Sequence, residues 1–178
     1  MLNRRLTQHS SRMRRKGSHA APGAQRGLFL IEALLGILIF SLGILALIGM
    51  QAAAISAQSD ARYRMEAANQ AEKIVDTIWL NVDRTSTATL QTSLLTFQHM
   101  TGGTSCAFTG TASSNALVTS WASGVQAAST GLPGSTSAMQ QITVDTSSSG
   151  YNKVSVSVCW LAPRATAPSR HTVVTFVN

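Results

Sequence analysis

The first 27 of the 178 residues contain no acidic side chain, although they contain seven Arg or Lys. In the remaining residues seven basic side chains balance seven acidic ones, so the net charge of +7 belongs to the N-terminal segment. Nucleic-acid binding needs Lys and Arg clustered on a folded surface, and residues 28–178 show no such cluster in the sequence. The basic balance therefore does not indicate a nucleic-acid-binding protein.

Charged side chains are also missing from residues 33–59, and residues 28–50 contain 15 Leu, Ile or Phe and a single charge, Glu32. The uncharged run would form about 40 Å of helix, enough to cross a bilayer core of about 30 Å. Inserting residues 28–50 gains about 5 to 9 kcal/mol, more than one carboxylate near the start of the segment can offset. A basic block directly before such a run keeps the N-terminus in the cytoplasm. We predict a single membrane span.

Proline is missing between Gly23 and Leu132, so nothing stops the helix where the apolar run ends. Small and apolar residues then recur every three or four positions, which indicates an amphipathic face. We predict one helix from Leu28 to about Leu80, with a plain anchor followed by a stalk as the simpler alternative. The expected face comprises Ala61, Met65, Ala68, Ala71, Val75, Ile78 and Val82.

The sequence also lacks the groups of residues that form catalytic sites or bind metals. Asp145 is the only acid after Arg84, and His99 and His171 are isolated. Two cysteines and scattered histidines lack the spacing of a metal site, and no phosphate-binding glycine motif or nucleophile elbow occurs. We expect no enzymatic activity, no catalytic residues, no metal and no cofactor.

The rest of the chain alternates loops with short regular elements. The Ser-, Thr- and Gly-rich stretch 101–150 is expected to be mostly loop, with Gly102 and Gly103 in a turn. It should contain a short helix after a cap at Asn115, with Trp121 as a packing residue. Alternating patterns predict strands at 141–146, 153–161 and 171–177, with a hairpin turn at 146–152. We expect an α+β fold in which an antiparallel meander packs on the amphipathic half of the long helix.

The stretch from Gly27 to Leu35, GLFLIEALL, resembles the class III signal of type IV pilins and type II secretion pseudopilins. In that family a glycine precedes the new N-terminus, and a glutamate occupies the fifth mature position, which Glu32 fills if the cut follows Gly27. Leu28 stands where most members have phenylalanine, and Phe29 where they usually have a hydroxyl residue. The resemblance covers residues 26 to about 80 and implies the type IV pilin fold.

The resemblance also implies roles for these residues. A prepilin peptidase would cleave between Gly27 and Leu28 and methylate the new amine of Leu28. Glu32 would be the assembly contact, because pairing with a neighbouring subunit's N-terminal amine relieves the cost of a carboxylate in lipid. The alternative is a Glu32 that only reaches the headgroups. The implied divisions are a cleaved leader (1–27), a transmembrane half-helix (28–58), an amphipathic half-helix (59–84) and a periplasmic head (85–178).

Residues 117 to 161 are similar to the PilV group of minor pilins. Trp121 with a short helix, then Leu132-Pro133-Gly134, then a Val-rich strand ending in Cys159-Trp160 carries this second resemblance. It implies a minor pilin that starts pilus assembly with other minor and major pilins on the inner-membrane assembly platform. The head would be periplasmic and later part of the filament. Two alternatives stay open, a type II secretion pseudopilin and a DNA-capturing subunit that uses Lys153, Arg164, Arg170 and His171 at one end of the sheet.

Cys106 and Cys159 both lie in the part expected outside the inner membrane, where disulfides persist. We predict that they pair, with two free buried thiols as the alternative. The bond would close a loop of 54 residues. The chain-entropy model assigns such a loop roughly 4 kcal/mol of stabilisation.

Overall fold

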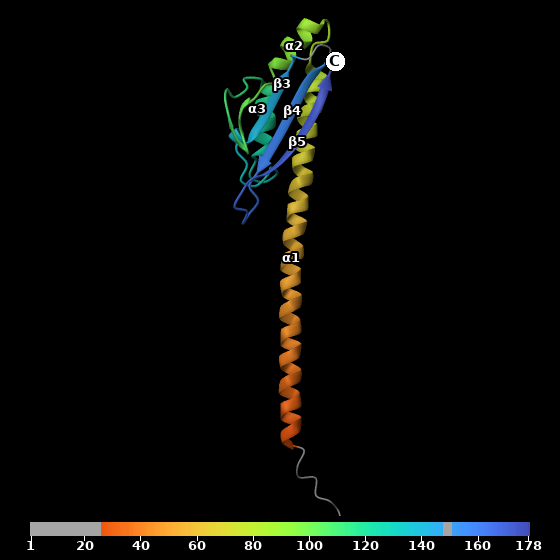
Figure 1. The fold of residues 1–178 in the computed structure, drawn as a ribbon, viewed down its shortest axis with the longest axis vertical. Coiled ribbons are helices and arrows are strands. Elements are labelled where there is room, and N and C mark those ends of the chain that lie inside the picture. Colours follow the sequence, from red (N-terminus) through yellow and green to blue (C-terminus); the bar gives the residue numbers. More distant parts are fainter. Residues whose placement is uncertain (1–25, 148–150) are drawn as a thin grey trace, which may run out of the picture. The chain divides into compact units, whose positions relative to one another are not determined.

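The computed structural model describes residues 26–147 and 151–178, and the chain divides after Met50 into two compact units. The predicted leader lies outside the described residues except for Arg26 and Gly27, which begin the first helix. The protein is α+β, a long N-terminal helix followed by a small antiparallel sheet, as in a pilin-like fold (Figure 1). Its elements are α1 (Arg26–Asn81), α2 (Thr87–Leu95), β1 (Gly102–Thr104), β2 (Ala107–Thr109), α3 (Ala116–Val125), the 3-10 helix η1 (Ser137–Met139), β3 (Gln140–Asp145), β4 (Asn152–Trp160) and β5 (Ser169–Val177).

The first unit consists, in its described part, of the apolar beginning of α1. Its large side chains are exposed on every side of the helix, for example Leu34 at 65% and Phe40 at 70%. Within the described residues α1 is the one helix long and apolar enough to cross a membrane. An apolar helical segment whose side chains stay exposed among the described residues needs another apolar environment.

In the second unit, α1 contributes one stripe to the core. The later part of the predicted face is correct, because Ala71, Ile78 and Val82 are buried and Val75 packs against the core. The predicted members Ala61 and Met65 are exposed, Met65 at 62%, and the stripe begins only at Ala67. The indole Nε1–H of Trp121 on α3 donates to the carbonyl oxygen of Gln70 at 2.8 Å, so α3 contacts α1 at this turn. The buried stripe comprises Ala67, Ala71, Ile74, Ile78 and Val82.

The sheet has the strand order β3-β4-β5, with both pairs antiparallel, which confirms the predicted meander. Part of the predicted β3–β4 turn, residues 148–150, lies outside the described residues. One face of β4 joins the α1 stripe and α3 in a single apolar core. Burial alternates along the outer strand β5 and is nearly continuous along the central strand β4, because only β4 has a strand on each side. The core residues of β4 are Val154, Val156, Val158 and Trp160.

Two local elements were not predicted from the sequence. Helix α2 follows a capping box in which Ser86 Oγ accepts from the Thr89 backbone N–H at 3.2 Å, and it buries Leu90 and Leu94. Strands β1 and β2 form a hairpin where only loop was expected. The predicted turn at Gly102-Gly103 is wrong, because both glycines belong to β1. The turn falls at Ser105 and Cys106, whose φ angles of 55° and 67° are both positive, as a two-residue hairpin loop of type I′ requires.

Gly103→Ala tests whether this hairpin depends on glycine. Gly103 has φ +79°, and an added Cβ would clash with the carbonyl oxygen of Ala107. We expect a loss of about 1–3 kcal/mol in unfolding free energy, the usual range for a residue held in a sparsely populated conformation. Urea unfolding of the full chain in detergent, followed by tryptophan fluorescence, measures it. Gly124→Ala is the matched control, because Gly124 lies in α3 with no atom within 4 Å of an added Cβ. It should leave stability unchanged or raise it by up to about 1 kcal/mol.

Candidate assembly site and the disulfide-linked head

The predicted cleavage site lies in the first turn of α1. An added Cβ on Gly27 would meet no atom within 4 Å outside the helix's own backbone, and Leu28 is 75% exposed. The peptide bond between them is therefore accessible to another protein. Glycine leaves this backbone open to close approach.

Glu32 lies one helical turn after Leu28, on the same face of α1. It is exposed, and its neighbours Leu28, Ile31 and Leu35 are also more than half exposed. Within the described residues Glu32 has no side-chain hydrogen bond and no salt bridge. A carboxylate in an apolar surface is costly to remove from water unless it is paired, so Glu32 can act as an acceptor for a cation from another chain.

The disulfide predicted from the sequence is present between Cys106 and Cys159, whose Cα atoms are 5.7 Å apart. Neither cysteine is free, so the alternative of two buried thiols does not hold. The bond fixes the β1–β2 turn to β4, and Cys159 is fully buried. The two cysteines form a second small core with Phe108, with Met100 and Met139 packed against it. This core lies on the outer face of the sheet. The β1–β2 hairpin that contributes Cys106 and Phe108 to it was expected from the sequence to be only loop.

Buried polar side chains join the loops of the head to the sheet. His99 is 3% exposed; its Nδ1 accepts from the Ser113 N–H at 3.1 Å, and its Nε2 lies 3.2 Å from the Ser137 carbonyl oxygen. The bond to Ser113 places the ring proton on Nε2, so that Nε2–H donates to Ser137. The side chain of Gln140, which is fully buried, donates to the Cys159 carbonyl oxygen at 3.1 Å. These contacts give His99 and Gln140 a structural role, which could not be predicted from the sequence.

Two exposed aspartates stabilise turns by accepting hydrogen bonds. The backbone N–H of Thr85, followed by its side chain, holds the pKa of Asp83 below its usual value. The hydroxyl and then the backbone N–H of Ser147 lower the pKa of Asp145. A carboxyl group whose pKa is lower in the folded state stabilises the fold above its unfolded pKa. This contribution is lost as the pH falls below about 4 through the lower folded value.

Of the four cationic residues considered for DNA capture, three lie at one end of the sheet and Lys153 lies at the other. Lys153 pairs with Phe176 near the start of β4, whereas Arg170 pairs with Cys159 near its end. His171, opposite Val158, and Arg164, in the loop after β4, belong to the end where Arg170 lies. The expected group of four is therefore wrong as a cluster. Among residues 26–147 and 151–178, no group of three or more His, Cys, Asp or Glu is placed to hold a metal.

Comparisons with known proteins returned no match to a protein-family model, to a curated protein or to a solved structure. The functional interpretation therefore depends on the residues and on the fold.

Proposed function

We propose that the chain is a minor pilin of a type IV pilus, processed by a prepilin peptidase and active in starting pilus assembly. One observation carries this proposal. A glycine and, five positions later, a glutamate without a hydrogen bond or salt bridge among the described residues begin an exposed apolar helix. The later part of that helix contributes to the core of a disulfide-linked sheet domain. Each part has a task in a subunit that is first stored in a membrane and then polymerised.

The apolar part of α1 supports storage in the membrane and later burial in a filament. Its exposed side chains are satisfied by lipid before assembly and by other apolar helices after it. Glu32 distinguishes these two environments. In lipid its carboxylate is unpaired, whereas in a filament it can accept from the methylated amine of a neighbouring Leu28. This difference favours polymerisation and gives the contact a defined position along the helix.

The head supports the narrower assignment to a minor pilin. The sequence similarity to the PilV group extends from α3 through the end of β4, and this segment supplies Trp121, Leu132 and Trp160 to the core. We propose other minor pilins, the major pilin and the inner-membrane assembly platform as partners. The proposed location is the inner membrane, with the N-terminus cytoplasmic and the head periplasmic, followed by the filament.

Processing by the peptidase tests the proposal directly. The full chain should be expressed with and without a prepilin peptidase, and its N-terminus should then be sequenced. We expect residues 1–27 to be lost only with the peptidase, leaving a methylated Leu28. Co-purification of pilus subunits, and not of secretion pseudopilins, is the expected second result. An uncut chain, or a cut elsewhere, would contradict the proposal.

The control for processing is a second glycine of the same helix. Gly27→Leu should abolish cleavage by putting a side chain at the scissile position. Gly36→Leu should be cleaved normally, since an added Cβ at Gly36 also meets no atom within 4 Å. Equal loss of cleavage in both variants would assign the effect to the helix and not to the site.

A further inference from the structure

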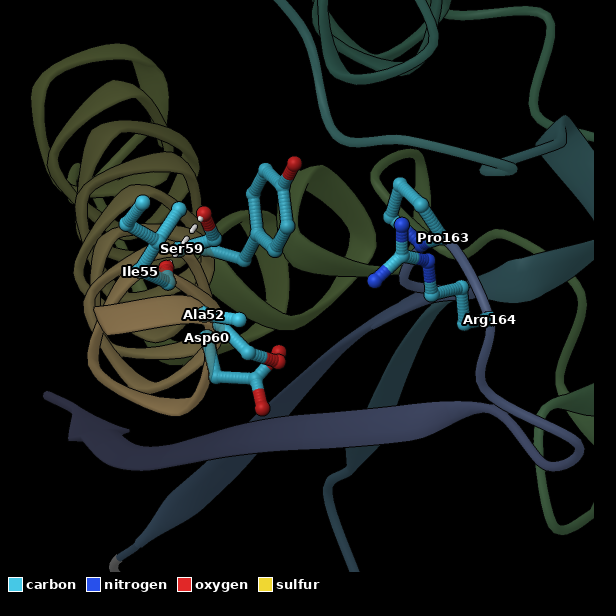
Figure 2. A pocket seen from close by; sticks show the side chains of 8 residues that line it. Ala52, Ile55, Ser59, Asp60, Pro163 and Arg164 are labelled. Carbon is cyan, nitrogen blue, oxygen red and sulfur yellow. Dashed lines mark hydrogen bonds between the residues drawn. The ribbon is translucent and has the colours of Figure 1, made fainter. Parts of the chain in front are cut away.

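A cavity of about 250 Å³ lies in the second unit between α1 and the loop that follows β4. One wall comes from α1 residues 52–63, and the other comes from Pro163 and Arg164 (Figure 2). Drug-sized ligands occupy pockets of about 300–1,000 Å³, so this cavity suits a smaller group. It is lined by Ala52, Ile55, Ser56, Ser59, Asp60, Tyr63, Pro163 and Arg164.

The two walls carry opposite charges. Asp60 on α1 and Arg164 on the loop point toward each other across the cavity (Figure 2). No salt bridge within 4.0 Å joins them in the described part of the chain. The guanidinium retains its fork of N–H donors, and the carboxylate retains two acceptor oxygens. A ligand with an anionic and a cationic group a short distance apart would complement both walls.

The backbone of Arg164 is in an unusual conformation. Its φ of 72° is positive, a conformation that is strained for a residue other than glycine. A turn holds this conformation, because the Ala165 N–H donates to the Ala162 carbonyl oxygen at 2.9 Å. The surrounding loop thus fixes the backbone of Arg164, whose guanidinium points toward α1 (Figure 2). Strain of this kind concentrates at ligand-binding positions.

The sequence places this cavity at a membrane boundary. Asp60 is the first charged side chain after Glu32, and it ends the uncharged run of residues 33–59. If that run crosses the bilayer, as in the proposed function, Asp60 lies at the headgroup level of the outer side. Ile55 is 63% exposed and lies one turn before Ser59, on the wall that would adjoin the acyl region. Tyr63 has an apolar ring and a polar hydroxyl, a combination that is common at membrane interfaces.

We propose that this cavity binds the headgroup of a phosphatidylethanolamine-type lipid. Arg164 binds the phosphate, for which its planar fork allows two parallel hydrogen bonds. Asp60 accepts from the primary ammonium group. A choline headgroup has no N–H to donate to Asp60, and a glycerol headgroup has no cation for it. One tyrosine is not the aromatic cage that recognises a quaternary ammonium. The inference rests on the membrane insertion in the proposed function.

The test uses the purified full chain in mixed detergent micelles with equal amounts of phosphatidylethanolamine, phosphatidylcholine and phosphatidylglycerol. Native mass spectrometry counts the lipids that stay bound. We expect retention of phosphatidylethanolamine about tenfold above each of the other two lipids. Asp60→Asn and Arg164→Gln should each reduce that preference at least about fivefold. Equal retention of the three lipids by the wild-type chain would overturn the proposal without relying on any variant.

The matched control is Arg62→Gln, which removes a positive charge two residues from Asp60 but outside this cavity. It should keep the lipid preference, and a loss as large as that of Arg164→Gln would overturn the site. Competition with glycerophosphoethanolamine, the headgroup without acyl chains, tests whether the site requires a lipid. If this compound displaces phosphatidylethanolamine completely at equal concentration, the site binds a soluble ligand and the lipid assignment is overturned. Carbonate extraction of membranes separates the two proposals. A chain released by carbonate fails the proposed function, whereas an inserted chain without lipid preference fails only this site.

Discussion

Replacing Cys106 and Cys159 together by alanine is expected to lower the free energy of unfolding by about 4 kcal/mol. The bond joins residues 53 positions apart, and the chain-entropy model assigns a loop of this size about that stabilisation. The Ser-, Thr- and Gly-rich loops that it restrains contain few large apolar side chains of their own. Urea unfolding of the full chain in detergent measures the change. Trp121 and Trp160, both buried in the head, are suitable fluorescent reporters.

Reduction supplies the control for this experiment. A reducing agent should lower the stability of the wild-type chain to that of the double variant and should leave the double variant unchanged. Alanine is preferred to serine, because Cys159 is fully buried and a new hydroxyl there would add a desolvation cost of its own. A loss below about 1 kcal/mol would show that the hairpin is held by packing of Phe108 and not by the disulfide.

Much of the fold could be predicted from apolar periods that extend over a whole helix or strand. The short paired strands could not be predicted in this way. The three strands of the meander and helix α3 were placed correctly because their apolar periods run over six residues or more and end at recognisable breakers. Strands β1 and β2 have three residues each, too short for any period. The turn between them is bonded to Cys159, more than fifty positions away, which joins Cys106 and Phe108 in the second core.

The α1 stripe shows a different limit. Alanine is compatible with either face of a helix, so Ala67 and Ala68 are equivalent in the sequence. Ala67 is the one that is buried, in the core that also contains Trp121. The cavity lined by Arg164 could not have been predicted from the sequence, since Asp60 on its opposite wall precedes Arg164 by more than a hundred positions. By contrast, Gly27, Leu28 and Glu32 form a contiguous motif, and their spacing needs only the helix that joins them.

Glu32→Ala is expected to leave cleavage and membrane insertion intact and to remove the chain from filaments. Breaking a buried ion pair by deleting one partner costs about 3–5 kcal/mol, because the remaining charge is left uncompensated. In the proposed filament the uncompensated charge would be the N-terminal amine of the neighbouring subunit. Incorporation should therefore fall on the order of a hundredfold. The ratio of the chain in sheared filaments to the chain in membranes, measured by quantitative immunoblotting, reports it.

Glu72→Ala is the matched control, because Glu72 is an exposed glutamate on the same helix, beyond its apolar part. It should be incorporated normally. Glu32→Asp should restore part of the incorporation, since it keeps the charge but shortens the reach by one methylene, whereas Glu32→Gln should not. This order separates a role of charge from one of helix propensity, in which Glu and Gln are nearly equal. Normal incorporation of Glu32→Ala would refute the pairing, because a carboxylate that only reaches the headgroups contributes nothing to contacts inside a filament.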